Sequence, residues 1–163
     1  MAFRVDPLSL ADRWAVVDIF NYYIENTFAA FPEERVTDEF FDWLLRLSRG
    51  YKALSAKDKN GRVIGFGLLR AHSPVPTLSR TAEISYFILP EHTRKGIGGA
   101  LLEKLVESAR TKKLTSLLAC ISSLNEGSIA FHRKNGFVEC GCFRGIGIKK
   151  GRVFDVLWMQ KML

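Results

Sequence analysis

The chain has no long hydrophobic run and few cysteines. Its apolar stretches fall far short of the roughly 20 residues that a membrane-spanning helix needs, and residues 1–6 lack the apolar segment of a signal peptide. Three cysteines occur among 163 residues, an odd number that gives no complete disulfide framework. These absences argue against a membrane protein and a disulfide-stabilised secreted protein, and they lead us to expect a cytoplasmic one.

The cysteines also lack the spacing of a metal or redox site. Cys140 and Cys142 lie two residues apart in a strand-like segment, which places both on one face. No second pair follows, so we expect buried or half-buried thiols there and no metal. Cys120, in the apolar run 117–121, is expected in the core of a strand.

Two common phosphate-binding motifs are missing as well. A G-x-G-x-x-G pattern counted from Gly96 puts Leu101 at the third glycine, and G-x-x-x-x-G-K-[ST] does not occur. The formal net charge is +7, but the basic residues are scattered, without an arginine-rich arm or an aromatic RNA-binding signature. We therefore favour an enzyme with an anionic ligand over a nucleic-acid-binding protein, because a diffuse positive field also attracts a small anionic ligand.

The most informative segment that is present runs from residue 83 to residue 102. Its β-branched and aromatic start predicts a strand, and a basic, glycine-bearing turn with Arg94 and Lys95 follows. Apolar residues then recur at helical spacing: Ile97, Leu101, Leu105 and Ala109. Turn N–H groups and the positive end of a helix dipole favour a phosphate ligand, although a tight strand–helix connection would have the same pattern.

Length and periodicity predict one domain over residues 1–163, with elements in the order β-α-α-β-β-β-α-β-α-β-β. Asn60-Gly61 predicts a hairpin turn, Thr37 a helix start, and Gly136 a left-handed helix end. The strands are expected at 3–5, 51–56, 63–69, 82–89, 116–121, 138–148 and 153–162. Such a chain belongs to the α/β (α+β) class and forms a mixed sheet.

Several of these segments together resemble the GNAT superfamily of acetyltransferases. The glycine turn is similar to that family's Gln/Arg-x-x-Gly-x-Gly/Ala segment, with Thr93 at the Gln/Arg position. Residues 125–137 resemble its Asn-x-x-(small)…Tyr-x-x-x-Gly-Phe segment, with His132 at the tyrosine position. That histidine, with segments at 21–24, 82–83, 145–149 and 155–160, is similar to the phosphinothricin and methionine-sulfone branch. The resemblance implies a mixed, mostly antiparallel sheet of about seven strands flanked by four helices.

The resemblance also implies acetyl-CoA as cosubstrate and assigns residues to it. The main chain of Phe87 and Ile88 would pair with the pantetheine amides like an added strand and polarise the thioester carbonyl. Asn125 would bond the pantetheine arm, with Ser128 in the same set, although Asn125 is also a favoured helix N-cap. The pyrophosphate would be held by Arg94, Lys95, Gly96, Ile97, Gly98 and Gly99.

Two residues are candidates for acid–base chemistry. The resemblance implies that Glu83 is the general base for the amine, a role worth about 100- to 10,000-fold, whereas pattern alone equally fits a glutamate in a salt bridge. His132 is either a proton donor to the leaving thiolate or a helix histidine that shapes the pocket. We expect His92 to order the glycine turn and His72 to line the acceptor cleft.

The implied activity is transfer of an acetyl group to the amine of a small amino acid or analogue, by direct attack in a ternary complex and without a metal. A protein, polyamine or aminoglycoside amine is the alternative acceptor, and a non-catalytic acyl-CoA-binding module is the alternative class. Residues 72–76 lack the branch's usual aromatic–basic stretch, so Arg70 or Arg80 would have to hold an acceptor carboxylate. The branch further implies a homodimer, and no membrane or nucleic-acid partner is expected.

Overall fold

The computed structural model describes residues 3–163, which form seven strands and four α-helices in the predicted order. Short 3-10 turns precede α1, β4 and α3. The elements are β1 (Phe3–Pro7), α1 (Arg13–Asn26), α2 (Glu39–Leu47), β2 (Ala53–Asp58), β3 (Val63–Ala71), β4 (Thr81–Ile88), α3 (Ile97–Thr111), β5 (Ser116–Ser122), α4 (Glu126–Lys134), β6 (Val138–Lys149) and β7 (Arg152–Met162). The predicted fold class and element order are confirmed.

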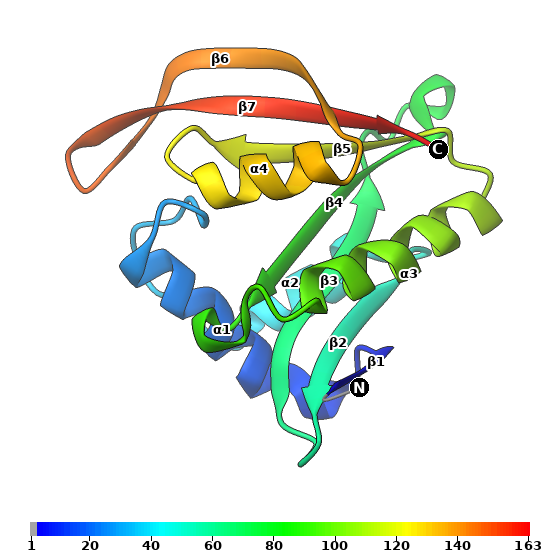
Figure 1. The fold of residues 1–163 in the computed structure, drawn as a ribbon, viewed down its shortest axis with the longest axis vertical. Helices are drawn as coiled ribbons and strands as arrows, with labels where there is room; N and C mark the ends of the chain where they lie inside the picture. Colours follow the sequence, from blue (N-terminus) through cyan, green and yellow to red (C-terminus); the bar gives the residue numbers. More distant parts are fainter. Residues whose placement is uncertain (1–2) are drawn as a thin grey trace.

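All seven strands belong to one sheet with the order β1-β2-β3-β4-β5-β7-β6, so β7 lies between β5 and β6. Every pair is antiparallel except β4–β5. That parallel pair has only three partner positions, from Thr81↔Ser116 to Glu83↔Leu118. Beyond Glu83, β4 continues alongside β3 alone and runs away from β5 below α4 (Figure 1). The sheet is therefore split at its centre.

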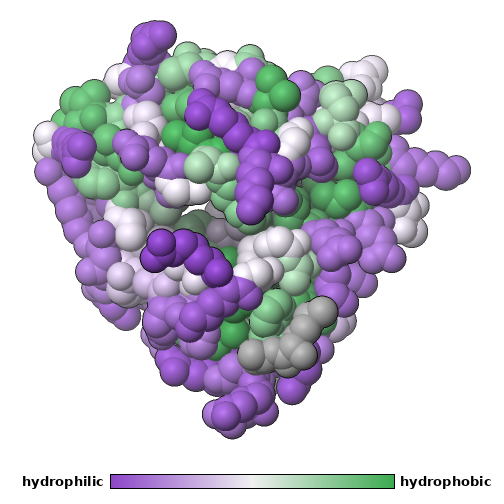
Figure 2. All heavy atoms as spheres, in the orientation of Figure 1, coloured by the Kyte–Doolittle hydropathy of each residue, from purple (hydrophilic) through white to green (hydrophobic). Residues whose placement is uncertain are grey.

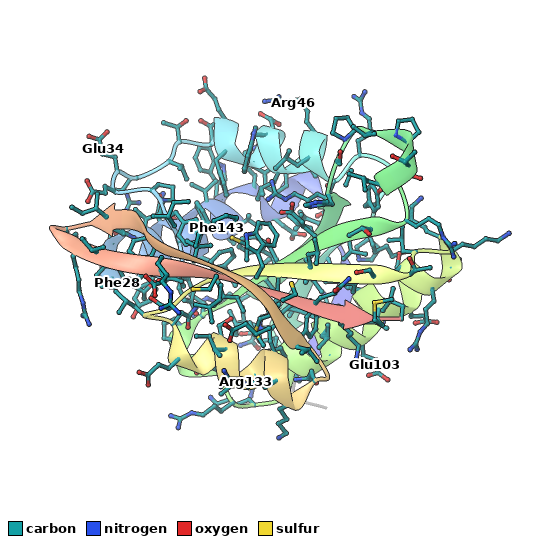
Figure 3. All side chains as sticks on the ribbon, turned by 90° about the horizontal axis from the view of Figure 1, so that it is seen from above. Phe28, Glu34, Arg46, Glu103, Arg133 and Phe143 are labelled. Carbon is teal, nitrogen blue, oxygen red and sulfur yellow. The ribbon has the colours of Figure 1, made fainter. Side chains whose placement is uncertain are left out.

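Helices cover both faces of the sheet. Seen from above, α1 and α2 lie on one side and α3 and α4 on the other (Figure 3). The apolar face predicted for α3 is buried against the sheet in one core cluster, while Val16, Ile19 and Phe41 from α1 and α2 belong to a second cluster. Burial of these stripes positions the helix ends around the split in the sheet.

Glycines with left-handed backbones shape three turns. Gly61 (φ 82°) lies in the predicted β2–β3 hairpin, Gly96 (φ 85°) starts α3, and Gly136 (φ 82°) follows α4. Other residues pay a steric penalty in this region, so the three predicted turns are confirmed where glycine is required. Thr37 was a wrong assignment, because Asp38 holds the N-cap position of α2.

The prediction of buried or half-buried thiols at Cys140 and Cys142 is wrong, because both side chains are exposed. They lie on β6, which forms an edge of the sheet and is exposed from residue 138 to residue 146. An alternating pattern places two residues on one face but does not say whether anything covers that face. Cys120 on β5 is half-buried rather than part of the core.

Candidate active site

A cavity of about 600 Å³ lies where β4 separates from β5. Its walls are residues 84–88 of β4, residues 119–121 of β5, the first turns of α4 and the glycine turn before α3, with Tyr23 and Ala29 on the remaining side. Figure 2 shows a hollow on this face, rimmed by hydrophilic side chains, between α4 and the loop before α3. A cavity of this size suits a small-molecule ligand.

The β4 backbone presents polar groups to the cavity at every second residue. The amide of Leu89 donates to Ile64 O at 2.9 Å, and Phe87 O lies 3.1 Å from the point where Gly65 would carry a Cβ. The N–H and C=O of Phe87 therefore face β3, whereas those of Tyr86 and Ile88 face the gap. This register supports the main-chain role predicted for Ile88 and contradicts the one predicted for Phe87, whose side chain nevertheless lines the cavity.

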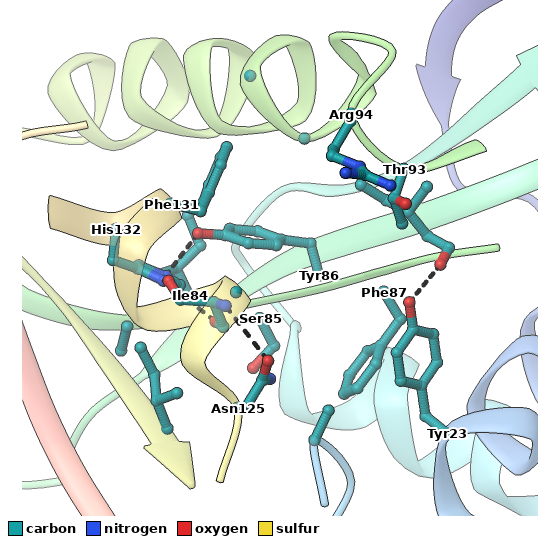
Figure 4. A pocket seen from close by; sticks show the side chains of 18 of the residues that line it. Tyr23, Ile84, Ser85, Tyr86, Phe87, Thr93, Arg94, Asn125, Phe131 and His132 are labelled. Carbon is teal, nitrogen blue, oxygen red and sulfur yellow. Dashed lines mark hydrogen bonds between the residues drawn. The ribbon is translucent and has the colours of Figure 1, made fainter. Parts of the chain in front are cut away.

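Tyr23, which sequence analysis missed, occupies one of these polar groups. Its hydroxyl donates a hydrogen bond of 2.5 Å to Ile88 O (Figure 4). Burial raises the pKa of the Tyr23 hydroxyl above its ordinary value, although the bond to Ile88 opposes this, so the phenol stays a donor. A residue of α1 thus ties the first helix to the open edge of β4.

The glycine turn supplies hydrogen-bond donors at one end of the cavity. The first intrahelical bond of α3 runs from Ala100 N to Gly96 O, so the N–H groups of residues 97–99 precede the helix ladder. Together with the positive helix end they form an anion-binding corner. The predicted residues Arg94, Gly96, Gly98 and Gly99 line the cavity.

Two predicted members of that corner point elsewhere. Lys95 is exposed and does not line the cavity, and the Ile97 side chain is buried in the core below the turn, so only its main chain can contribute. A Cβ on Gly98 would lie 3.3 Å from the Phe131 ring, which explains the need for glycine at this close approach.

Asn125 and Ser128 line the cavity from the start of α4. The Asn125 side-chain oxygen accepts a hydrogen bond of 3.2 Å from Ser128 N, which confirms the N-cap interpretation.

The buried His132 and the half-buried Tyr86 form a hydrogen-bonded pair at the cavity wall. His132 Nδ1 lies 2.7 Å from Ser128 O, so this nitrogen carries the hydrogen, and Nε2 accepts a bond of 2.5 Å from the Tyr86 hydroxyl (Figure 4). Burial lowers the pKa of His132, with the bond to Ser128 opposing it, and burial raises the pKa of Tyr86 far above its ordinary value. At neutral pH the pair is therefore a neutral imidazole and a neutral phenol. Tyr86 was not predicted as a site residue.

Glu83 lies at the last position of β4 that pairs with β5, next to residues that line the cavity but not among them. Its carboxylate accepts a hydrogen bond from Arg70 and bonds His72 Nδ1 at 2.9 Å, and its side chain is 11% exposed. Strand alternation puts Glu83 on the α1–α2 side of the sheet with Phe87, opposite Tyr86.

Both alternatives that the sequence left open for Glu83 remain compatible with this geometry, since a paired carboxylate can still act as a base. The two arginines expected to hold an acceptor carboxylate do not point freely into the cavity. Arg70 is engaged by Glu83, and Arg80 is exposed just before β4. His72 touches Glu83 and lies edge-on to Trp158 at 6.1 Å, next to the region where it was expected.

Cys120 lines the same cavity from β5. Burial, together with the nearby Glu83 charge, raises the pKa of the Cys120 thiol to about 11. The thiol is therefore protonated at neutral pH and is a poor nucleophile.

Within residues 3–163, no helix has the length and apolar character needed to cross a membrane. Nor does this part of the chain gather three His, Cys, Asp or Glu side chains into a group that could hold a metal ion.

The split in the sheet gives the cavity an open strand edge and an anion-binding helix end, an arrangement that suits an acyl-CoA-dependent transferase. The sequence model of the acetyltransferase (GNAT) family matches residues 16–137. The chain belongs to this family.

The chain is also similar to individual members of this family. The chain is 32% identical to the L-methionine sulfoximine/L-methionine sulfone acetyltransferase of Pseudomonas aeruginosa, over 98% of this chain and 94% of that protein. The solved phosphinothricin acetyltransferase of Sinorhizobium meliloti, in complex with AcCoA, superposes with a TM-score of 0.94 at 29% identity, covering 100% of this chain and 89% of that one. The ribosomal-protein-alanine N-acetyltransferase of Brucella melitensis superposes with a TM-score of 0.91 at 36% identity, covering 98% and 99%.

Proposed function

We propose that this protein transfers the acetyl group of acetyl-CoA to the primary amine of a small amino acid or analogue. The observation that carries the proposal is the split between β4 and β5, which has an anion-binding helix end on one side and the Glu83 carboxylate on the other. The chain from β1 to β7 builds one sheet around this split, so we treat residues 1–163 as one catalytic domain.

The cosubstrate would lie along the open edge of β4. The N–H and C=O of Tyr86 and the N–H of Ile88 would bond the pantetheine amides, as an added strand would use them, while the Ile88 carbonyl accepts from Tyr23. The amides of residues 97–99 and the Arg94 side chain would hold the pyrophosphate, with Lys95 adding long-range charge. Asn125 and Ser128 would contact the pantetheine arm from the opposite wall.

Glu83 would remove the first proton from the substrate. An amino-acid α-amine is largely protonated at neutral pH and must become neutral before it can attack the thioester. Arg70 and His72 hold the carboxylate in place next to Ile84 and Ser85, both of which line the cavity, and a water can bridge the remaining gap. The amine would then attack the thioester directly in a ternary complex, and the raised pKa of Cys120 makes this thiol a poor candidate for an acyl-enzyme nucleophile.

Two acceptor classes have support. The relatives that act on methionine sulfone, methionine sulfoximine and phosphinothricin favour a free amino acid or analogue. The 36% identical ribosomal-protein-alanine N-acetyltransferase favours a protein N-terminus as the second candidate. A free amino acid also needs a group for its carboxylate, and in this fold Arg70 is already engaged by Glu83.

The deciding experiment measures free thiol release from acetyl-CoA with methionine sulfone, methionine sulfoximine, phosphinothricin, ordinary amino acids, polyamines, aminoglycosides and a peptide with an N-terminal alanine. We expect turnover with the amino-acid analogues. Turnover with the peptide alone would move the acceptor assignment to the second candidate. Binding of acetyl-CoA without any turnover would favour a non-catalytic module.

The matched variants are Glu83→Gln and Glu103→Gln, the latter an exposed glutamate on α3 outside the cavity. Loss of the base should lower kcat/KM by about 100- to 10,000-fold while the Kd of acetyl-CoA stays unchanged, and Glu103→Gln should behave as wild type. Wild-type kcat/KM in Glu83→Gln would contradict the assigned base.

The exposed edge strand supports a homodimer. β6 carries large exposed apolar residues, namely Val138, Phe143, Ile146 and Ile148, and an uncovered strand of this kind invites pairing with a second copy. Light scattering at micromolar concentration should show a dimer that Ile146→Lys dissociates, and a monomeric wild type would contradict the proposal.

The three free cysteines fit a reducing cytoplasm.

A further inference from the structure

Forming an amide from an ammonium group releases two protons, and the proposed function, on which this inference rests, accounts for one of them. Glu83 takes the first proton before the attack. The second is lost after the nitrogen has bonded to the acetyl carbon, when that nitrogen carries a positive charge. At the same stage the departing sulfur gains an electron pair and accepts a proton readily.

Glu83 is poorly placed for this second proton. It does not line the cavity, and its side chain lies on the α1–α2 side of the sheet. Tyr86 and His132 do line the cavity, and they lie on its α3–α4 side. They are joined by the 2.5 Å hydrogen bond between the Tyr86 hydroxyl and His132 Nε2.

The direction of that bond follows from its neighbours. Ser128 O, 2.7 Å from Nδ1, keeps the hydrogen of the neutral imidazole on Nδ1. Nε2 is thus a lone-pair acceptor and the phenol is the donor. The arrangement is that of a hydroxyl hydrogen-bonded to a general base, with the other ring nitrogen of that base held by a carbonyl. The phenol oxygen keeps lone pairs that can accept a hydrogen bond from a ligand in the cavity (Figure 4).

We propose that Tyr86 and His132 carry the second proton from the amine nitrogen to the departing sulfur. The nitrogen gives a proton to the Tyr86 oxygen while the phenol passes its own proton to His132 Nε2. As the C–S bond breaks and sulfur takes its electron pair, Nε2 returns the proton to the Tyr86 oxygen and the phenol gives one to sulfur. Nitrogen loses one proton, sulfur gains one, and both side chains end as they began.

The surroundings of the pair suit this two-way transfer. The His132 ring packs against the rings of Tyr86, Phe131 and Phe137, so no carboxylate among the described residues touches it and holds it charged. Burial lowers the pKa of His132, so the ring is free to accept a proton at neutral pH. Its imidazolium is then a stronger acid than an ordinary thiol of pKa about 8.5, which makes the return transfer to sulfur downhill.

The test is a double-mutant cycle on the acceptor that the wild type turns over. Tyr86→Phe and His132→Gln should each lower kcat by about 100-fold or more, because each breaks the same relay. The double variant should be no slower than either single variant, as expected for residues that act as a unit. The Kd of acetyl-CoA should be unchanged in all three, and Tyr22→Phe, outside the cavity, is the control.

Two results would overturn the relay: a kcat for Tyr86→Phe within about twofold of wild type, or losses that multiply in the double variant. Thermal unfolding checks that Tyr86→Phe is folded; if it is not, a wild-type kcat in His132→Gln alone overturns the proposal. Failure of the proposed function itself is distinguishable, because the wild type would then show no turnover with any amine.

Discussion

The buried ring of His132 gives the folded protein a pH dependence that an exposed histidine would not. Its pKa is lowered by burial, so between that lowered value and the ordinary 6.5 the unfolded chain binds more protons than the folded one. Stability should therefore fall as the pH drops through this window. We expect the Tm of wild type to fall more than that of His132→Gln between about pH 8 and pH 5.

A Tm difference between the two proteins that is constant over that range would contradict the lowered pKa. Titration of Asp12, another buried group, does not contribute to the Tm change between about pH 8 and pH 5. Burial opposes its charge, but bonds from Lys57, Ser9 N and Ser55 outweigh the burial and lower its pKa below 3.8. The stability due to Asp12 is present above pH 3.8 and is lost only as the pH falls further.

At the scale of elements, the turn that starts α3 depends on one glycine more than on its neighbour. Gly96 has a φ of 85°, and an L-residue there costs about 1–2 kcal/mol, whereas a Cβ on Gly99 would meet open space in a normal helical backbone. Since each kcal/mol shifts Tm by about 2–4 °C at this size, Gly96→Ala should lower Tm by roughly 2–8 °C. Gly99→Ala should not lower it.

The same pair of variants tests the anion-binding corner, because strain at Gly96 displaces the amides of residues 97–99. Titration with acetyl-CoA should show weaker binding by Gly96→Ala. Equal Tm values for the two variants would show that the left-handed backbone at Gly96 does not control this turn.

At the scale of the whole molecule, a buried lysine links β6, on one side of the split sheet, to the loop that follows α1. Lys149 on β6 is fully buried and donates to Thr27 O at 2.8 Å and Ala30 O at 2.7 Å, in the segment that follows α1. Phe31 of the same segment stacks on Phe154 of β7, with the two ring centroids 5.9 Å apart. Because Ala29 of this segment lines the cavity, Lys149 positions one wall of the site from across the split.

Lys149→Met should leave two carbonyls without their donor, at a cost of about 1–3 kcal/mol, and release residues 27–31. We expect faster amide hydrogen exchange in this segment than in wild type. We also expect the KM for the acceptor to rise more than the KM for acetyl-CoA. The exposed Lys104→Met on α3 is the matched control. Unchanged exchange in residues 27–31 would show that the lysine does not hold the segment.

The sequence by itself determined the features that depend on local spacing. Periods of two and 3.6 residues placed the strands and helices, and Asn60-Gly61, Gly96 and Gly136 marked turns that need a left-handed backbone. Motif resemblance then identified the family and pointed to Glu83, Asn125 and His132. Each of these signals lies within a short stretch of chain, so no knowledge of distant contacts was required.

The tertiary structure alone decided which distant residues meet. Strand register turned the Phe87 amide toward β3 and brought Tyr86 to His132, and the place of β7 inside the sheet left β6 with its cysteines at the edge. The split beyond Glu83 and the reach of Lys149 across it likewise follow from pairing between remote segments. Local periodicity fixes the face of a residue, but only long-range packing fixes what that face contacts.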